Sequence, residues 1–213
     1  MENGKLEKIY AKLFQAFGPQ HWWPGETPFE VAVGAVLTQN TNWQNVEKAI
    51  NNLKRARALD PIKIYRMSNE RLAKLIKPSG YYNVKAKRLK AFMSFLVEEY
   101  GGDMERMQQE DTSLLREKLL SVKGVGEETA DSILLYALGK PVFVIDAYTK
   151  RVLSRHKLLG ADEPYSGCQE KFHNALGRNS KLYNEYHALF VRLGKYYCRP
   201  RPVCSECPLK ADL

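Results

Sequence analysis

The chain has 213 residues, with 33 lysines and arginines against 24 aspartates and glutamates, which gives a formal charge of +9 at pH 7. Hydrophobic residues make up 44% and charged residues 27%, a globular composition that excludes a disordered or fibrous protein. No apolar run approaches the roughly 18 residues of a membrane-spanning helix. The N-terminus also lacks an apolar signal segment, so we expect a cytoplasmic protein with no membrane partner.

The spacing of apolar residues predicts one helix after another. They recur every three or four positions over 5–17, and a buried helix is expected to begin near Pro28. Further helices are expected over 43–57, from Pro61, from Ser68, over 85–100 and over 114–120. The best strand candidate is a segment of only five residues, 141–145. The sequence therefore favours an all-α protein, and any subdomains would be interwoven rather than tethered.

The length is compatible with one large domain or two small ones, and the charge leaves the partner open. A surplus of nine positive charges is typical of a protein that binds a polyanion, but a soluble basic protein would show it equally. The four cysteines are too few for a disulfide scaffold, and three of them lie within the last sixteen residues. That crowding indicates metal ligation.

The most informative stretch is 119–151. Its first part predicts two helices joined by a tight turn with two glycines one residue apart, Gly124 and Gly126. The unpaired N–H groups at the start of the second helix would form a site for a phosphodiester, although an ordinary helical corner would also explain the glycines. Asp146 then precedes a helical run, which makes it a candidate N-cap.

This stretch resembles the helix-hairpin-helix and the following aspartate loop of the endonuclease III superfamily of DNA glycosylases. The resemblance rests on Leu120-x3-Gly-Val-Gly-x2-Thr-Ala and on Val-Ile-Asp-Ala-Tyr-Thr-Lys-Arg over 144–151, and it extends to 37–41, 80–86 and the cysteine tail. It implies a six-helix barrel lobe over 27–138 that ends in the hairpin. A second lobe would combine 1–26 with 139–213, which carry the aspartate loop and the cysteine cluster.

The resemblance further implies a monomer that binds double-stranded DNA containing damaged bases. The residues that it assigns to DNA contact are Gln39, Asn40, Lys123, Gly124, Val125, Gly126, Thr129 and Arg151.

By the same resemblance, Asp146 acts on the sugar of a flipped nucleotide. A carboxylate there would stabilise the oxocarbenium character that builds up as the N-glycosidic bond breaks, and would orient the attacking water. Bifunctional members of the superfamily carry a lysine in the hairpin that forms a Schiff base, but the matching residue here is Glu128. Glu128, the second candidate at the catalytic site, cannot form an imine, so the sequence predicts a monofunctional enzyme. As an alternative, Glu127 and Glu128 only complement the helix dipole.

The loop His-Trp-Trp-Pro over 21–24 contains two adjacent tryptophans, which either pack between subdomains or bind a ligand. Together with Trp43, this loop resembles the 3-methyladenine DNA glycosylase III branch of the superfamily. A methylated purine is positively charged and stacks well on electron-rich rings, so 3-methyladenine and 7-methylguanine are the expected substrates. The expected base-pocket residues are Trp22, Trp23, Pro24, Trp43 and Lys195, the last of which could equally contact phosphate.

The spacing Cys198-x5-Cys204-x2-Cys207 resembles the iron–sulfur loop of the superfamily. A [4Fe–4S] cluster takes four thiolates, and the fourth is missing where the chain stops after Asp212–Leu213. Cys168 lies thirty residues earlier in what reads as a turn. A cluster, a zinc ion and an empty loop all remain open, and we favour the cluster.

Three functions are therefore in competition. The first is a monofunctional glycosylase for alkylated purines. The second is an endonuclease III-like glycosylase/lyase for oxidised or mismatched pyrimidines, against which Glu128 and the tryptophan pair argue. The third is a non-catalytic helix-hairpin-helix protein that only binds DNA, which would not need Asp146.

Overall fold

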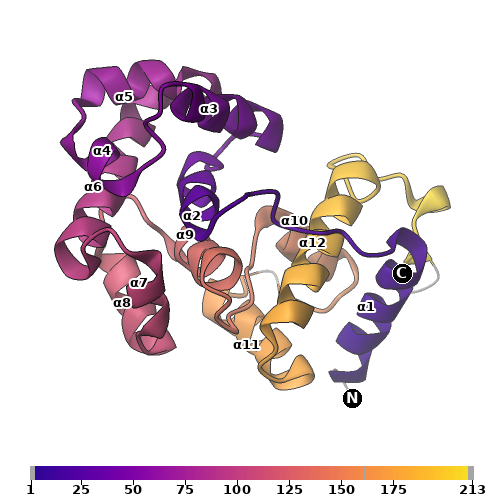
Figure 1. Ribbon diagram of the computed structural model, residues 1–213. Coiled ribbons are helices and arrows are strands. Elements are labelled where there is room, and N and C mark those ends of the chain that lie inside the picture. Colours follow the sequence, from indigo (N-terminus) through magenta and orange to yellow (C-terminus); the bar gives the residue numbers. More distant parts are fainter. Residues whose placement is uncertain (1–2, 161, 211–213) are drawn as a thin grey trace. The chain divides into compact units, whose positions relative to one another are not determined.

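The computed structural model describes residues 3–160 and 162–210. Over these residues the protein is helical without a β-strand, which confirms the all-α prediction (Figure 1). The chain divides into two compact units. One is Pro24–Lys140, here the central unit, and the other is Met1–Trp23 with Pro141–Leu213, here the terminal unit. The central unit begins three residues before the predicted barrel lobe and ends two residues after it.

The central unit is built from short helices, most of which begin at a side-chain cap. Thr27, Asn42, Asp60 and Ser68 each accept a hydrogen bond from the backbone N–H three residues on, as the capping rule expects. The elements are α2 (Pro28–Leu37), α3 (Trp43–Arg55), α4 (Pro61–Arg66), α5 (Asn69–Leu75), η1 (Lys77–Ser79), α6 (Tyr82–Tyr100), α7 (Met104–Gln109), α8 (Thr112–Ser121), α9 (Glu127–Ser132) and the π-helical turn η2 (Ile133–Ala137).

The core of the central unit is formed around α2 and α6. Every residue of α2 from Glu30 to Leu37 is buried, as the apolar sequence of this helix predicts. The long helix α6 packs against α2, α4 and α5 and buries its apolar stripe, including Leu89, Phe92 and Leu96. The short helix α7 was not predicted.

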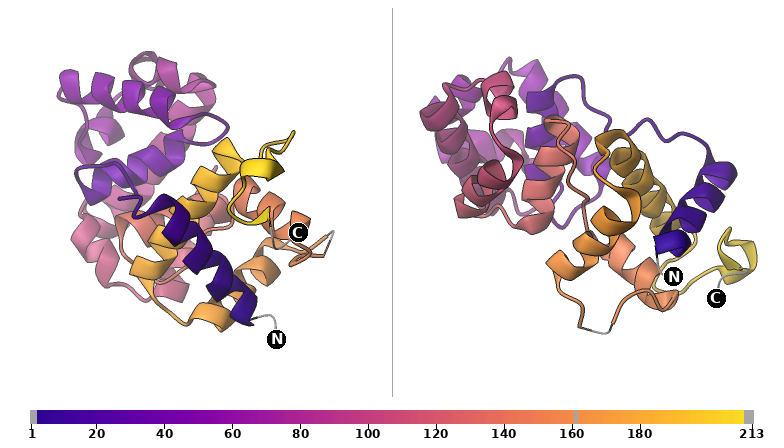
Figure 2. Two further views of the ribbon diagram at one scale, coloured as in Figure 1. Left: turned by 90° about the vertical axis from the view of Figure 1, so that its right-hand side faces the viewer. Right: turned by 90° about the horizontal axis from the view of Figure 1, so that it is seen from below.

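The terminal unit is assembled from the two ends of the chain. Its elements are α1 (Asn3–Phe17), α10 (Ala147–Arg155), α11 (Tyr165–Leu176), α12 (Ser180–Tyr196) and η3 (Cys204–Glu206). The helix α1 lies alongside α11 and α12, and the Tyr186 hydroxyl donates to the Leu6 carbonyl at 2.7 Å (Figure 1, Figure 2). Aromatic rings fill this core, where Phe143 stacks on Phe172 with 3.7 Å between ring centroids.

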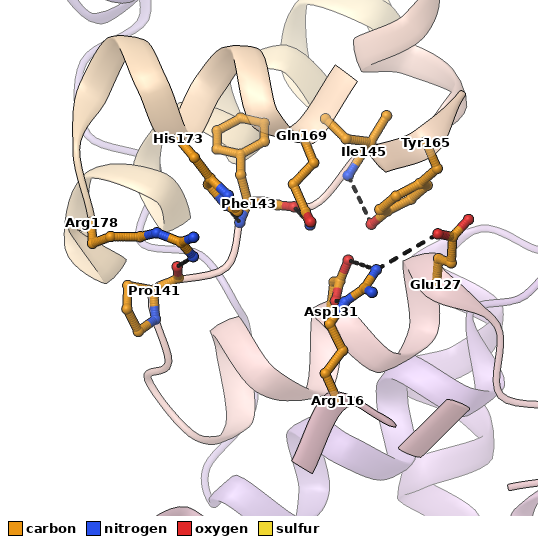
Figure 3. A network of polar contacts seen from close by, with 10 residues as sticks. All are labelled: Arg116, Glu127, Asp131, Pro141, Phe143, Ile145, Tyr165, Gln169, His173 and Arg178. Atoms are coloured by element: carbon orange, nitrogen blue, oxygen red, sulfur yellow. Dashed lines mark hydrogen bonds and ion pairs between the residues drawn. The ribbon is translucent and has the colours of Figure 1, made fainter. Parts of the chain in front are cut away.

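Two sequence expectations fail in the terminal unit. The segment around Cys168 is not a turn, because Cys168 is buried within α11. The strand candidate 141–145 is not a strand. Its backbone groups bond to side chains of α11 instead of to a neighbouring strand (Figure 3).

Within the described part of the chain, no helix is long and apolar enough to cross a membrane.

Candidate functional site

The helix-hairpin-helix lies in the central unit, where α8 and α9 flank the turn 122–126. Gly124 has φ +90°, and a Cβ atom there would lie 2.4 Å from Cγ of Arg88, so only glycine fits this turn. The two helices are joined by a bidentate ion pair between Arg116 and the fully buried Asp131, with N···O distances of 2.7 and 3.1 Å (Figure 3). The turn is therefore held in shape before any ligand binds.

The loop after α2 is fastened to this turn by Gln39. Its Nε2 donates to the Gly124 carbonyl at 3.0 Å and to the Thr129 hydroxyl at 2.9 Å, and its Oε1 accepts from Arg88. The structure thus brings three predicted DNA-contact residues together, namely Gln39, Gly124 and Thr129. Both the amide nitrogen and the amide oxygen of Gln39 already have hydrogen-bond partners within the protein. The next residue, Asn40, is exposed and has φ +53°, so Asn40 is the residue presented at the tip of the loop.

The remaining predicted DNA-contact residues of the hairpin differ in their exposure to solvent. Lys123 and Gly126 are exposed, whereas Val125 is buried and supports the turn from within. Glu128 is exposed in the first turn of α9, beside Glu127, where a carboxylate also complements the helix dipole.

In the terminal unit, Asp146 is the N-cap of α10. Its Oδ1 accepts from the Thr149 N–H at 2.7 Å, and its Oδ2 lies 3.6 Å from Nε2 of His187 on α12. The Asp146 side chain is 12% exposed. Burial disfavours the charged form, but the His187 imidazole and the Thr149 amide outweigh it and hold the pKa of Asp146 below its usual value. The site therefore contains a fixed, ionised carboxylate. Nothing in the sequence analysis had pointed to His187.

The side chain of Arg151, one of the predicted DNA-contact residues, binds main-chain carbonyls of the terminal unit. Its Nε donates to the Cys198 carbonyl at 2.6 Å and its Nη2 to the Gly194 carbonyl at 3.0 Å. The guanidinium also lies over the Tyr148 ring, 5.1 Å from its centroid. Arg151 therefore ties α10 to the end of α12 in this structure.

Of the three cysteines of the tail, Cys198 and Cys207 are buried and Cys204 is exposed. In the residues that the structure describes, no group of three or more His, Cys, Asp or Glu side chains is arranged to hold a metal ion. The arrangement of these described side chains is not that of a four-thiolate cluster. Asp212–Leu213 lie outside the described residues. The cluster stays a prediction, which iron and sulfide analysis of the purified protein would test.

A cavity of about 280 Å³ opens in the central unit, beside the start of α2 and α3. It brings together two of the predicted base-pocket residues, Pro24 and Trp43. Three carboxylates and one ammonium line it, a formal charge of −2, and the ammonium of Lys54 contacts two of the carboxylates at 3.0 and 2.9 Å. The lining residues are Pro24, Gly25, Glu26, Glu30, Trp43, Glu47, Ile50, Asn51 and Lys54.

The other predicted pocket residues belong to the terminal unit. Trp22 and Trp23 contact each other edge to face, with 5.5 Å between ring centroids. Lys195 is exposed, and its ammonium lies over the ring of Tyr196.

Comparison with known proteins identifies the class to which this fold and site belong. Residues 33–177 match the model of the HhH-GPD superfamily base excision DNA repair proteins. The chain is 49% identical to a provisionally named DNA repair glycosylase of Methanocaldococcus jannaschii, over 99% of this chain and 97% of that protein. It is 31% identical to the endonuclease III of Thermotoga maritima, over 96% and 90% of the two chains.

Among solved structures, the crystal structure of the H. pylori 3-methyladenine DNA glycosylase bound to 1,N6-ethenoadenine superposes with a TM-score of 0.77. The two sequences are 31% identical, and the match covers 91% of this chain and 97% of that one. The chain therefore belongs to the HhH-GPD superfamily of base excision DNA repair proteins. It is a DNA glycosylase, a hydrolase of N-glycosidic bonds that acts in base excision repair of DNA.

Proposed function

We propose that this glycosylase removes positively charged alkylated purines, with 3-methyladenine and 7-methylguanine as substrates, and that water is its nucleophile. The observation that carries the proposal is the Asp146 carboxylate, which is 12% exposed, accepts from the Thr149 N–H and lies 3.6 Å from His187. A fixed negative charge stabilises the oxocarbenium-like sugar as the base departs and orients a water for attack. A cationic base is already a good leaving group, so this mechanism needs little acid catalysis.

The central cavity supports the choice of a cationic base. Its aromatic wall at Trp43 suits stacking, and its net charge of −2 favours a positive ring over a neutral one. Its volume of about 280 Å³ lies just below the range of ligand pockets, which is about 300 to 1,000 Å³. The H. pylori neighbour was crystallised with a modified adenine, and its name gives 3-methyladenine as its substrate.

The hydrolytic mode is supported by the residue at the lysine position of the hairpin. Glu128 stands there and cannot form a Schiff base with the sugar. We therefore expect an abasic site as the product, with no strand cleavage.

The test uses DNA treated with a methylating agent, alongside duplexes that carry thymine glycol or uracil, each incubated with and without borohydride. Release of methylpurine without a trapped protein–DNA adduct is the expected result. A trapped adduct would refute the hydrolytic mode, and release confined to the pyrimidine lesions would refute the substrate class.

The role of Asp146 is tested by Asp146→Asn. Asparagine is as good an N-cap as aspartate, so this variant keeps α10 and removes only the charge. We expect base release to fall by at least about 100-fold while DNA binding is retained. Asp60→Asn, which changes another helix cap in the same way, is the matched control and should leave release unchanged. Full activity of Asp146→Asn would contradict the proposal.

A further inference from the structure

The extended segment 141–145 leads directly into Asp146. Its Pro141 carbonyl accepts from Arg178 at 3.3 Å, and its other side-chain contacts come from one helix, α11. The Phe143 N–H donates to Nε2 of His173 at 3.1 Å, and the Phe143 carbonyl accepts from Nε2 of Gln169 at 2.6 Å (Figure 3). Both backbone groups of this buried residue are thus satisfied by side chains of α11.

A third contact of the same kind follows two residues on. The Ile145 N–H donates to the Tyr165 hydroxyl at 3.2 Å (Figure 3). Tyr165, Gln169 and His173 are spaced by four residues on α11, so they lie along one face of the helix. That face binds the backbone at two alternate residues of the segment, Phe143 and Ile145, and Ile145 is adjacent to Asp146.

We propose that Tyr165, Gln169 and His173 are positioning residues, which set the place of the Asp146 carboxylate for hydrolysis by holding the segment 141–145. The inference rests on the proposed catalytic role of Asp146. The side chain of Asp146 is oriented from its C-terminal side by the Thr149 amide and by His187. On its N-terminal side, these three side chains hold the backbone at Phe143 and Ile145, the part of the segment next to Asp146.

The rate of base release depends on the exact position of the Asp146 carboxylate. A carboxylate that stabilises a developing positive charge acts over a short range, so a displacement of about 1 Å can lower the rate by about 100-fold. The segment has no ladder of strand hydrogen bonds to hold it, because the structure contains no strand among its described residues. Side chains of α11 take over this function.

The test compares Tyr165→Phe and Gln169→Leu with the wild type in single-turnover base release, at a temperature where circular dichroism shows every variant to be folded. The substrate is the lesion that the wild-type protein releases fastest. We expect the maximal rate to fall between about 10- and 100-fold, and the enzyme concentration that gives half-saturation to stay unchanged. A fall in DNA affinity with an unchanged maximal rate would overturn the inference.

The matched control is Tyr183→Phe. It deletes another tyrosine hydroxyl of the terminal unit, one that donates to the Gly177 carbonyl. The phenylalanine keeps the ring that lies against Phe143 and His173. The maximal rate of this variant should equal that of the wild type. A loss as large as that of Tyr165→Phe would show that any hydroxyl deletion in this unit slows the enzyme, and would refute a specific role for Tyr165.

A double variant identifies the residue through which α11 acts. If Tyr165 works through Asp146, then Tyr165→Phe causes no further loss in the Asp146→Asn background, whereas multiplied losses would contradict the inference. The two proposals also fail differently. Full activity of Asp146→Asn refutes the catalytic role itself. An inactive Asp146→Asn together with fully active Tyr165→Phe and Gln169→Leu refutes only the role of α11.

Discussion

Lys85 is a buried cation in the core of the central unit, and its burial predicts a measurable dependence of stability on pH. The side chain is 1% exposed, and its ammonium donates to the Leu37 carbonyl at 2.8 Å and to the Ser79 carbonyl at 2.6 Å. It thereby ties the end of α2 to η1. Burial, with a smaller contribution from the charge of Arg88, lowers the pKa of Lys85 from 10.5 to about 8.

The sign of the effect follows from where the proton binds. A lysine in the unfolded chain titrates near 10.4, so between about pH 8 and pH 10.4 the unfolded state binds more protons than the folded one. The free energy of unfolding therefore rises with pH across this window, by about 3 kcal/mol in total. This contribution is complete above about pH 10.4 and is lost as the pH falls through about 8.

The perturbation is Lys85→Met, which keeps the length of the side chain and removes the titrating group. Urea unfolding of both proteins is followed at intervals from pH 7 to pH 10.5, and the quantity of interest is wild type minus variant. Tyr100 and Tyr186, whose pKa values burial raises, are present in both proteins, so their effects cancel in the difference. We expect this difference to grow by about 3 kcal/mol in favour of the wild type.

Lys90→Met provides the control. Lys90 lies on the same helix and also donates to backbone carbonyls, those of Ile64, Tyr65 and Met67, but it is only half-buried. The comparison separates the loss of lysine–carbonyl bonds from the titration of a buried amine. A wild-type-minus-Lys85→Met difference that stays constant from pH 7 to pH 10.5 would refute the reasoning, because the Lys85 ammonium would then be as well solvated in the folded protein as in the unfolded chain.

Three further predictions follow from the packing and the charge. Arg116→Met removes the bidentate partner of the buried Asp131, so the free energy of unfolding in denaturant should fall by about 3–5 kcal/mol, and a fall below about 1 kcal/mol would contradict this. Gly194→Ala would place a Cβ atom 2.5 Å from the Tyr148 ring, so the free energy of unfolding should fall by about 1–3 kcal/mol in a thermal unfolding experiment. An unchanged midpoint temperature would show that α10 and α12 can move apart at no cost. The charge of +9 predicts that the logarithm of DNA affinity falls linearly with the logarithm of salt concentration in a binding titration. A DNA affinity that does not change with salt would contradict binding through contacts between basic side chains and phosphates.

Most helix starts and the position of the Asp146 carboxylate could be predicted from the sequence, because both are encoded locally. Thr27, Asn42, Asp60 and Ser68 each bond to an amide three residues away, so the signal and its partner lie in the same short stretch. Asp146 follows the same rule, and the structure shows it as both an N-cap and a buried carboxylate.

The polar side chains that bond to distant backbone atoms could not be predicted in this way. The sequence motifs contain Arg151 and Lys85, but they do not show that each side chain binds a main-chain carbonyl more than forty residues away. A carbonyl or an amide is present at nearly every position, so the identity of the partner leaves no trace in the sequence. For the same reason, the sequence could not predict that Tyr165, Gln169 and His173 bind the backbone of the segment 141–145.

The sequence alone determined the helical class, the glycine-dependent turn, the buried helix α2 and the aspartate that opens α10, because each depends on local backbone preference or on hydrophobic spacing. The tertiary structure alone decided that Gln39 is bound to the hairpin, that Arg151 binds carbonyls of its own unit, and that α11 replaces a strand as the support of the segment before Asp146. These arrangements depend on which buried backbone groups must find a partner once the chain has folded, and that requirement arises only when distant segments meet.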